Sequence, residues 1–154
     1  MKKSSFLIVS FFLVVFSASF WIYKNAAARA IELKALRTDD YQSGCGWSIE
    51  DPKKQFIVSI DIIDKFPAIV RFDGKRHELK WVTSTEPTVG NRVGDTFIKK
   101  YASDGVELVL NFTTTKICDP KDDHCENTDY SVDLYLKDHQ RELKFQRLGG
   151  SSGC

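Results

Sequence analysis

The four cysteines have the most distinctive chemistry in this chain of 154 residues, and they are Cys45, Cys118, Cys125 and Cys154. A zinc site built from Cys118, His124 and Cys125 would need a fourth ligand, and an adjacent His and Cys rarely point at one ion. In an oxidising compartment, four cysteines are more simply explained by two disulfides. The sequence therefore predicts disulfide bonds and no metal site.

Three pairings of four cysteines are possible, and the sequence favours Cys118 with Cys125 and Cys45 with Cys154. The first bond would close a loop that contains Pro120, and the second would join the first residue of the folded domain to its last. Closing a loop of about a hundred residues stabilises a domain by roughly 4–5 kcal/mol when only chain entropy is counted. The cysteines are thus expected to brace the fold.

Carboxylates crowd the loop between two of these cysteines and continue just beyond it. They are Asp119, Asp122, Asp123, Glu126 and Asp129. Oxygen ligands of this kind bind hard cations such as calcium, but their spacing matches no EF-hand and Lys121 interrupts the series. The spacing favours a solvated acidic loop, which could also present negative charge to a basic partner. No cofactor is expected.

The three histidines, His77, His124 and His139, are the remaining candidates for acid–base chemistry, and all fall in or beside predicted turns. None of them stands next to a serine or cysteine in a recognisable nucleophile motif. Asp138 and His139 are neighbours, but neighbouring side chains on a turn diverge, whereas a catalytic pair must converge. The sequence therefore predicts no catalytic residue. An enzyme would require His77 or His139 to line a deep pocket.

Residues 1–25 form a hydrophobic N-terminal segment, for which the sequence predicts a helix. Two lysines precede an apolar run from Phe6 to Ile22, and this order is typical of a secretory signal. The run also reaches the roughly 17–20 residues that span a bilayer, and Trp21 and Tyr23 suit a membrane interface. A signal peptide and a membrane anchor both stay open.

The location that this segment predicts is the same in either case. Ala26-Ala27-Ala28 offers a cleavage site, after which the chain would be periplasmic or secreted. Without cleavage, residues 6–23 would anchor the chain to the bacterial inner membrane. We therefore expect the folded domain to lie outside the cytoplasm.

Two regions follow the N-terminal segment. Residues 26–44 are predicted to form a short helix over 26–37, where strong helix formers dominate, and then a polar linker. Residues 45–154 are predicted to form a disulfide-braced β domain. That domain carries 16 Lys plus Arg residues against 18 Asp plus Glu residues, a formal charge of −2. A charge so near to balance argues against nucleic-acid binding.

Within this domain, apolar residues alternate with polar ones, as in strands that bury one face. The Asp-Gly pairs at 73–74 and 104–105 suit type I′ turns, in which both positions need a positive φ. The predicted strands cover residues 47–50, 55–63, 68–72, 76–82, 96–102, 106–115, 130–136 and 142–145. Successive hairpins predict an all-β fold, an antiparallel meander of seven or eight strands in a small barrel or a sandwich.

Two connections between these strands are long and polar, and they cover residues 83–94 and 119–129. Loops held on a rigid β scaffold commonly carry binding function. The candidate partner-binding residues in them are Glu86, Asn91, Arg92, Asp122, Asp123 and Glu126. We expect the partner to be a protein of the cell envelope.

A signal segment is followed by Val70-Arg71-Phe72-Asp73-Gly74-Lys75, then by Leu79 and a Gly-Asp start to the next strand. This series resembles the periplasmic inhibitors of c-type lysozyme. This resemblance covers residues 68–112. It implies an eight-stranded barrel with a disulfide. The activity that it implies is the inhibition of a wall-degrading enzyme. The inhibitory Ser-Gly-x-x-Tyr loop of that family corresponds to residues 83–87 here, which read Thr-Ser-Thr-Glu-Pro, so none of its functional residues carries over.

The domain as a whole, from Cys45-Gly46 to Gly153-Cys154, is similar to small uncharacterised bacterial envelope proteins, which implies a compartment and no activity. Together these features predict a non-enzymatic extracytoplasmic binding protein that acts through loops 83–94 and 119–129, as an inhibitor or an immunity protein. The alternative is a membrane-anchored structural or assembly protein of the cell envelope.

Overall fold

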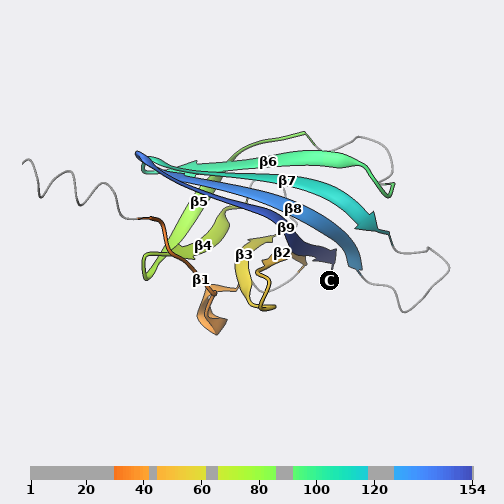
Figure 1. Ribbon diagram of the computed structural model, residues 1–154, viewed down its shortest axis with the longest axis horizontal. Helices are drawn as coiled ribbons and strands as arrows, with labels where there is room; N and C mark the ends of the chain where they lie inside the picture. Colours follow the sequence, from red (N-terminus) through yellow and green to blue (C-terminus); the bar gives the residue numbers. More distant parts are fainter. Residues whose placement is uncertain (1–29, 42–44, 62–65, 86–91, 118–126, 154) are drawn as a thin grey trace, which may run out of the picture. The chain divides into compact units, whose positions relative to one another are not determined.

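The computed structural model describes residues 30–41, 45–61, 66–85, 92–117 and 127–153 of the chain. Eight antiparallel strands follow one another around a closed barrel, and a short additional strand pairs with one of them (Figure 1). The strands are β1 (Leu33–Lys34), β2 (Gly46–Glu50), β3 (Phe56–Asp61), β4 (Ala68–Phe72), β5 (Lys75–Ser84), β6 (Thr96–Ser103), β7 (Val106–Lys116), β8 (Asn127–Asp138) and β9 (Arg141–Gly153). The predicted all-β meander is confirmed, as a barrel.

Both predicted Asp-Gly hairpins are present. Asp73 and Gly74 have φ angles of 49° and 77°, and Asp104 and Gly105 have φ angles of 51° and 79°. These positive values are the ones that a type I′ turn requires. The third hairpin joins β8 to β9 and is longer than predicted, because residues 149–153 pair with β8 on one side and with β2 on the other. The barrel closes at this double pairing.

The inward side chains of the strands form the core of the barrel. Along β7, buried and exposed residues alternate from Val106 to Thr114, as the period of a strand with one solvated face requires. Three aromatic rings fill one part of the interior. Phe97 and Phe112 stack with their ring centroids 4.7 Å apart, and Tyr130 meets both rings edge-on at 5.5 to 5.6 Å.

Residues 31–41 lie along β3 and β4 and belong to the barrel. β1 pairs with the end of β4, and the amide of Leu36 donates a hydrogen bond to the carbonyl of Phe56 at 2.7 Å. Ile31 and Leu36 are only 4% and 7% exposed. This segment therefore buries apolar surface.

The helix predicted for residues 26–37 is wrong for residues 30–37, which are extended. Residues 26–29 lie outside the described part of the chain. Ala, Leu and Lys favour a helix, but local propensity is weak and tertiary contacts override it. Here the backbone of Leu33 and Lys34 pairs with Arg71 and Phe72 of β4, which supplies hydrogen bonds that an isolated helix would make internally. The predicted polar linker begins with a 3₁₀ turn over Thr38–Asp40.

Among the described residues, no helix has the length and apolar character needed to cross a membrane. The hydrophobic helix predicted within residues 1–25 lies outside that part of the chain.

Candidate functional site

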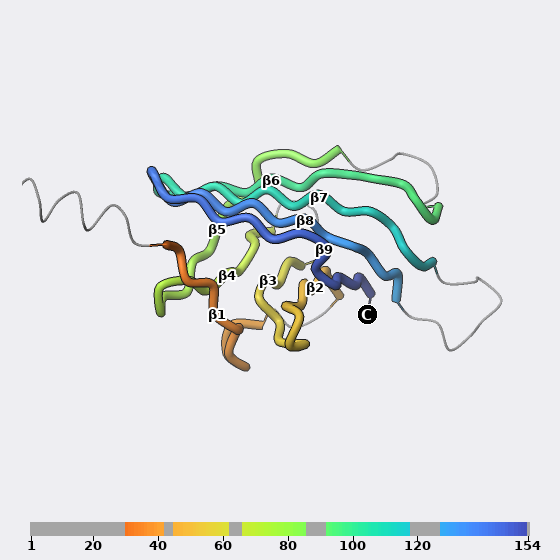
Figure 2. The backbone as a smooth tube through the Cα atoms, in the orientation of Figure 1, coloured from red at the N-terminus to blue at the C-terminus, as the bar shows by residue number. Residues whose placement is uncertain are grey.

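The two ends of the barrel are built differently, as the course of the backbone shows (Figure 2). We call the first the sealed end, and its four connections are short. They are residues 51–55, 73–74, 104–105 and 139–140. Turns of this length leave little chain beyond the strands.

We call the opposite end the loop end. It receives the longer of the connections between consecutive barrel strands, and β2 begins and β9 finishes there, because Gly46 pairs with Gly153. The connections at the loop end are residues 62–67, 85–95 and 117–126. The predicted binding loops 83–94 and 119–129 overlap two of them. An antiparallel meander alternates its connections between its ends, so these two loops share an end.

An arginine bridges two turns of the sealed end. The guanidinium of Arg141, in β9, donates to Oδ2 of Asp73 at 2.5 Å and also to the carboxylate of Asp138. Asp73 lies in the β4–β5 turn and Asp138 at the end of β8. The hydrogen bonds that Arg141 donates to Asp138 and Asp73 raise the pKa of its guanidinium. This end is therefore held by charge as well as by short turns.

A groove of about 210 Å³ reaches the loop end where β2, β3 and β9 meet. Three serines line it, Ser48, Ser59 and Ser151, and the Ser48 and Ser151 hydroxyls lie 3.0 Å apart. Tyr41 also lines the groove, and its ring meets Phe56 edge-on at 5.5 Å. Burial, with a smaller effect of the Asp40 charge, raises the pKa of Tyr41. The phenol is therefore neutral and can donate or accept a hydrogen bond.

Three buried polar atoms in the described part of the chain have no hydrogen-bond partner, and all three lie toward the loop end. They are Nε1 of Trp47, Oγ of Ser84 and Oγ1 of Thr114. Trp47 is the second residue of β2, Ser84 is the last of β5, and Thr114 is near the end of β7. Buried polar groups in folded proteins are nearly always paired, so exceptions call for an explanation such as a functional role. Their common position distinguishes the loop end from the sealed end.

A buried lysine lies inside the barrel in the same region. Lys99 of β6 is 3% exposed, and its ammonium group is 3.7 Å from the ring centroid of Trp47. A desolvated cation–π contact of this kind contributes about 2 kcal/mol. Because Trp47 is in β2, the contact joins opposite walls of the barrel. It also fixes an aromatic side chain that lines the groove.

Among the described residues, four large hydrophobic side chains are exposed, and they belong to elements that reach the loop end. They are Tyr41 (39%), Phe66 (41%), Val82 (52%) and Val93 (67%). Phe66 and Val93 lie in its connections, Val82 lies near the end of β5, and Tyr41 lines the groove.

Of the six predicted partner-binding residues, Arg92 falls within the described part. It is exposed, its amide donates to Oδ2 of Asp95 at 2.7 Å, and its carbonyl accepts from the Asp95 amide at 3.0 Å. This turn leads into β6 and holds Arg92 at the loop end. Glu86, Asn91, Asp122, Asp123 and Glu126 lie outside the described residues.

The predicted disulfide pairs are likewise only partly covered, because Cys118, Cys125 and Cys154 lie outside the described residues, as do the acidic positions 119–126. Their pairing and the calcium and zinc alternatives stay untested. Across the described ranges, no group of His, Cys, Asp and Glu side chains is arranged to hold a metal ion.

The two described histidines occupy different surroundings. The ring of His77 stacks on Phe72 with centroids 3.8 Å apart and planes 6° apart. Burial lowers the pKa of His77, so the neutral ring is the form that packs here. His139, at the β8–β9 turn, has a side chain that is 73% exposed. His77 is therefore partly covered.

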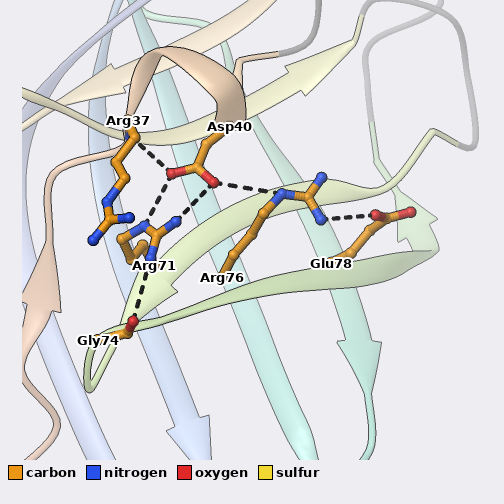
Figure 3. Close-up of polar contacts among 6 residues, drawn as sticks. All are labelled: Arg37, Asp40, Arg71, Gly74, Arg76 and Glu78. Carbon is orange, nitrogen blue, oxygen red and sulfur yellow. Dashed lines mark hydrogen bonds and ion pairs between the residues drawn. The ribbon is translucent and has the colours of Figure 1, made fainter.

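A buried ion-pair cluster around Asp40 could not be seen in the sequence (Figure 3). Asp40 is 1% exposed, and its carboxylate accepts from Nε and Nη2 of Arg71 at 2.9 and 3.0 Å and from the Arg37 amide at 2.8 Å. Nε of Arg76 lies 3.6 Å from Oδ1. These contacts fasten residues 31–41 to the β4–β5 hairpin. The two partners are 31 positions apart, so no local pattern links them.

Comparison of the chain with protein-family models, with curated proteins and with solved structures gave no match. The resemblance to lysozyme inhibitors and to bacterial envelope proteins therefore stays a prediction.

Proposed function

We propose that this protein is a non-enzymatic extracytoplasmic binding protein whose partner docks at the loop end of the barrel. The observation that carries the proposal is the difference between the two ends. The sealed end has short turns and the Arg141 bridge, whereas the loop end has the longer connections between consecutive barrel strands. Loops on a rigid scaffold are where binding residues usually stand. An inhibitor and an immunity protein are the two roles that fit this arrangement.

The unsatisfied polar atoms and the exposed hydrophobic residues also support docking at the loop end. Nε1 of Trp47 is a donor only, so it needs an acceptor from outside the described residues. Val93 is 67% exposed, and an apolar side chain gains free energy when a partner covers it. Neither observation depends on which residue of the connections touches the partner.

The export that we propose rests on the apolar run from Phe6 to Ile22. Export to an oxidising compartment would allow disulfides to form, and the register of the barrel supports one of them. β2 and β9 pair Gly46 with Gly153. Cys45 precedes Gly46 and Cys154 follows Gly153, and we propose that the pairing extends by this one residue. Directly opposite residues have Cα atoms about 4.5–5.5 Å apart, within the roughly 4.4–6.8 Å that a disulfide spans.

We expect a non-reducing peptide map of protein isolated from its producing cells to contain a linked pair of peptides with Cys45 and Cys154. The reason is the pairing of Gly46 with Gly153, which are the sequence neighbours of these two cysteines. Mass spectrometry before and after reduction makes the measurement. A peptide that links Cys45 to Cys118 or Cys125 would contradict the pairing, and free thiols at all four positions would contradict export to an oxidising compartment.

Substitutions at the loop end should remove partner binding while leaving the barrel intact. We expect cross-linking in envelope extract to join the protein to one stoichiometric partner. In the double variant Asn91→Ala with Arg92→Ala, the yield of this cross-linked product should fall at least tenfold. A matched pair on the outer wall, Lys144→Ala with Gln146→Ala, should keep it, because both residues are exposed and far from the loop end. Equal loss in both variants, or no partner at all, would refute the proposal.

The alternative of a membrane-anchored structural protein loses one of its supports. It relied on residues 26–37 as a helical stalk, but residues 30–37 are extended against the barrel. A segment that packs on the domain cannot hold it at a distance from an anchor. The binding role is therefore the better supported proposal.

A further inference from the structure

We infer that the wall of the barrel binds an extended segment of another protein, which adds as a strand to an open edge of β9. The segment has apolar side chains at alternate positions and a carboxylate among the others. Its binding place is the wall gap, which we define as the space between residues 141–148 of β9 and residues 32–35. The inference goes beyond the proposed function, because it does not require docking at the loop end.

The wall gap arises because β9 is longer than the strand beside it. β2 pairs with residues 149–153 of β9 and ends at Glu50, whereas residues 141–148 of β9 pair with β8 alone. In Figure 1, β9 runs on past β2 toward its turn with β8. In the described part of the chain, no strand pairs with the other edge of residues 141–148. An open edge of this kind is a template for pairing with another chain.

The short strand β1 forms the other side of the wall gap. It pairs with the edge of β4 that β3 occupies further along, because the opposite edge of β4 is paired with β5. The carbonyl of Glu32 accepts a hydrogen bond from the amide of Asp73 at 3.0 Å. In an antiparallel ladder, the pair that follows a hydrogen-bonded pair directs its backbone groups away from the partner strand. That next pair is Leu33 with Phe72, so the amide and carbonyl of Leu33 face away from β4.

A groove of about 300 Å³ lies in the wall gap, and its floor is apolar. Side chains of β3 and β9 line it together with residues 32–35. Ile57 and Leu148 are each 3% exposed, and Leu33 and Phe145 are partly buried against the core. Successive side chains of a strand point to opposite faces, so every second side chain of a bound segment would cover this floor.

The strand directions fit a segment that lies between the two sides. β1 and β3 are both antiparallel to β4, and β3 and β9 are both antiparallel to β2. β1 and β9 therefore run the same way, and a strand placed where β2 would continue is antiparallel to both. In strand addition, main-chain hydrogen bonds supply affinity and pockets for alternate side chains supply specificity. The edge of β9 and the apolar floor offer these two elements.

Two exposed cations border the wall gap without a carboxylate partner among the described residues. They are Lys53, which lines the groove, and Arg147, in the open stretch of β9. Lys34 also lines the groove but pairs with Glu32. Oδ1 of Asp51 accepts hydrogen bonds from two amides of its own turn, at 2.8 and 2.9 Å, so this carboxylate is engaged. A carboxylate on the bound segment would complement the two cations.

The test measures binding of blocked synthetic peptides to the full chain by fluorescence anisotropy. The probe peptide is as long as the open stretch of β9, alternates Val with Thr, and carries one Glu in place of a Thr. N-methylation of two alternate amides removes hydrogen-bond donors and should weaken binding about tenfold. Replacing Val by Ser should weaken it by about the same factor, and replacing Glu by Lys roughly threefold.

Amide hydrogen exchange, followed by NMR, locates the bound probe. Binding should slow the exchange of the Leu33 amide, which faces away from β4, and of alternate amides within residues 142–148. The amide of Lys34 is the matched control, because the alternation along β1 directs it toward β4. It should be protected before the probe is added and should change little afterwards.

Two variants and their controls test the surface. Ala35→Phe places a large side chain in the groove that Ala35 lines, and it should weaken the probe about tenfold. Ala35→Ser keeps a small side chain there and should bind normally. Lys53→Glu should weaken the probe roughly threefold, whereas Lys80→Glu, at an exposed position of β5, should not. Urea unfolding of each variant verifies that the barrel is intact.

Several results would overturn the inference. Equal binding of the N-methylated and unmodified probes would refute strand addition, and equal binding of the Glu and Lys probes would refute the carboxylate. A Leu33 amide already as protected as that of Lys34 in dilute protein would mean that the chain itself fills the wall gap. Protection that appears only on concentrating the protein would indicate a second copy. Failure of every peptide to bind would also refute the inference, and docking at the loop end would still be judged by cross-linking.

Discussion

Replacing Asp40 by Asn is expected to lower the free energy of unfolding by about 2–4 kcal/mol, because a guanidinium that is mostly buried would lose its carboxylate partner. The Arg71 side chain is 11% exposed and the Asp40 side chain 1%, so water cannot fully replace the lost contacts. Urea unfolding followed by tryptophan fluorescence makes the measurement. Asp39→Asn is the matched control, since Asp39 is an exposed neighbour, and it should change stability by less than about 0.5 kcal/mol.

The same cluster predicts how stability depends on pH. Hydrogen bonds from Arg71 hold the pKa of Asp40 below its usual value, against the opposing effect of burial. A carboxyl group whose pKa is lower in the folded state stabilises the fold above its unfolded pKa, near 3.9, and this contribution is lost as the pH falls through the folded value. The wild type should therefore lose more stability than Asp40→Asn below about pH 4. Parallel acid curves for the two proteins would contradict this role.

A double variant separates the ion pair from simple packing. Asp40→Leu with Arg71→Met removes both charges and keeps apolar volume, and replacing a buried pair in this way is often nearly neutral. It should be more stable than Asp40→Asn alone. If the double variant is as unstable as Asp40→Asn, the cost comes from the shape of the site and not from an unpaired charge.

Replacing Phe112 by Ala is expected to cost about 3–5 kcal/mol, the range for deleting a buried aromatic side chain. Phe112 is 1% exposed and touches both Phe97 and Tyr130, so the cavity would lie inside an aromatic cluster. Urea unfolding at neutral pH measures the change. A marginal domain could lose its fold entirely, so Phe112→Leu, which should cost less because it leaves a smaller cavity, is measured alongside.

Tyr130→Phe is the control for this cluster. It keeps the ring and removes only the hydroxyl, which lies 3.0 Å from the hydroxyl of Ser152. A neutral hydrogen bond of this kind contributes about 1 kcal/mol. A cost for Phe112→Ala no larger than that of Tyr130→Phe would mean that the three rings are not closely packed.

The hairpins could be predicted because their signals are local. Asp73-Gly74 and Asp104-Gly105 need only their own backbone geometry, and both adopt it. The extended segment at Leu33 and Lys34 could not be predicted in this way. Its residues favour a helix, and the hydrogen bonds that overrule that preference come from β4, more than thirty positions along the chain. The ion pair of Asp40 with Arg71 was missed for the same reason.

The loop end was partly visible in the sequence. Loops 83–94 and 119–129 were identified from their length and polarity, and alternation of connections in a meander places them at one end. The sequence could not show that Trp47, Ser84 and Thr114 bury unpaired polar atoms there. That property depends on the burial of the atom and on whether a hydrogen-bond partner lies nearby in the fold. No pattern in the amino-acid sequence indicates either.

The course of residues 31–41 decides how this protein should be attached to a surface or a label. The amide of Asp73 in the β4–β5 turn donates to the carbonyl of Glu32 at 3.0 Å, so the chain enters the domain beside the sealed end, whereas Gly153 finishes at the opposite end. A fusion or biotin placed before Ile31 would leave the loop end open to a partner in solution. The same group placed after Gly153 would crowd the rim, and a sensor surface prepared that way would report weaker binding than the protein has.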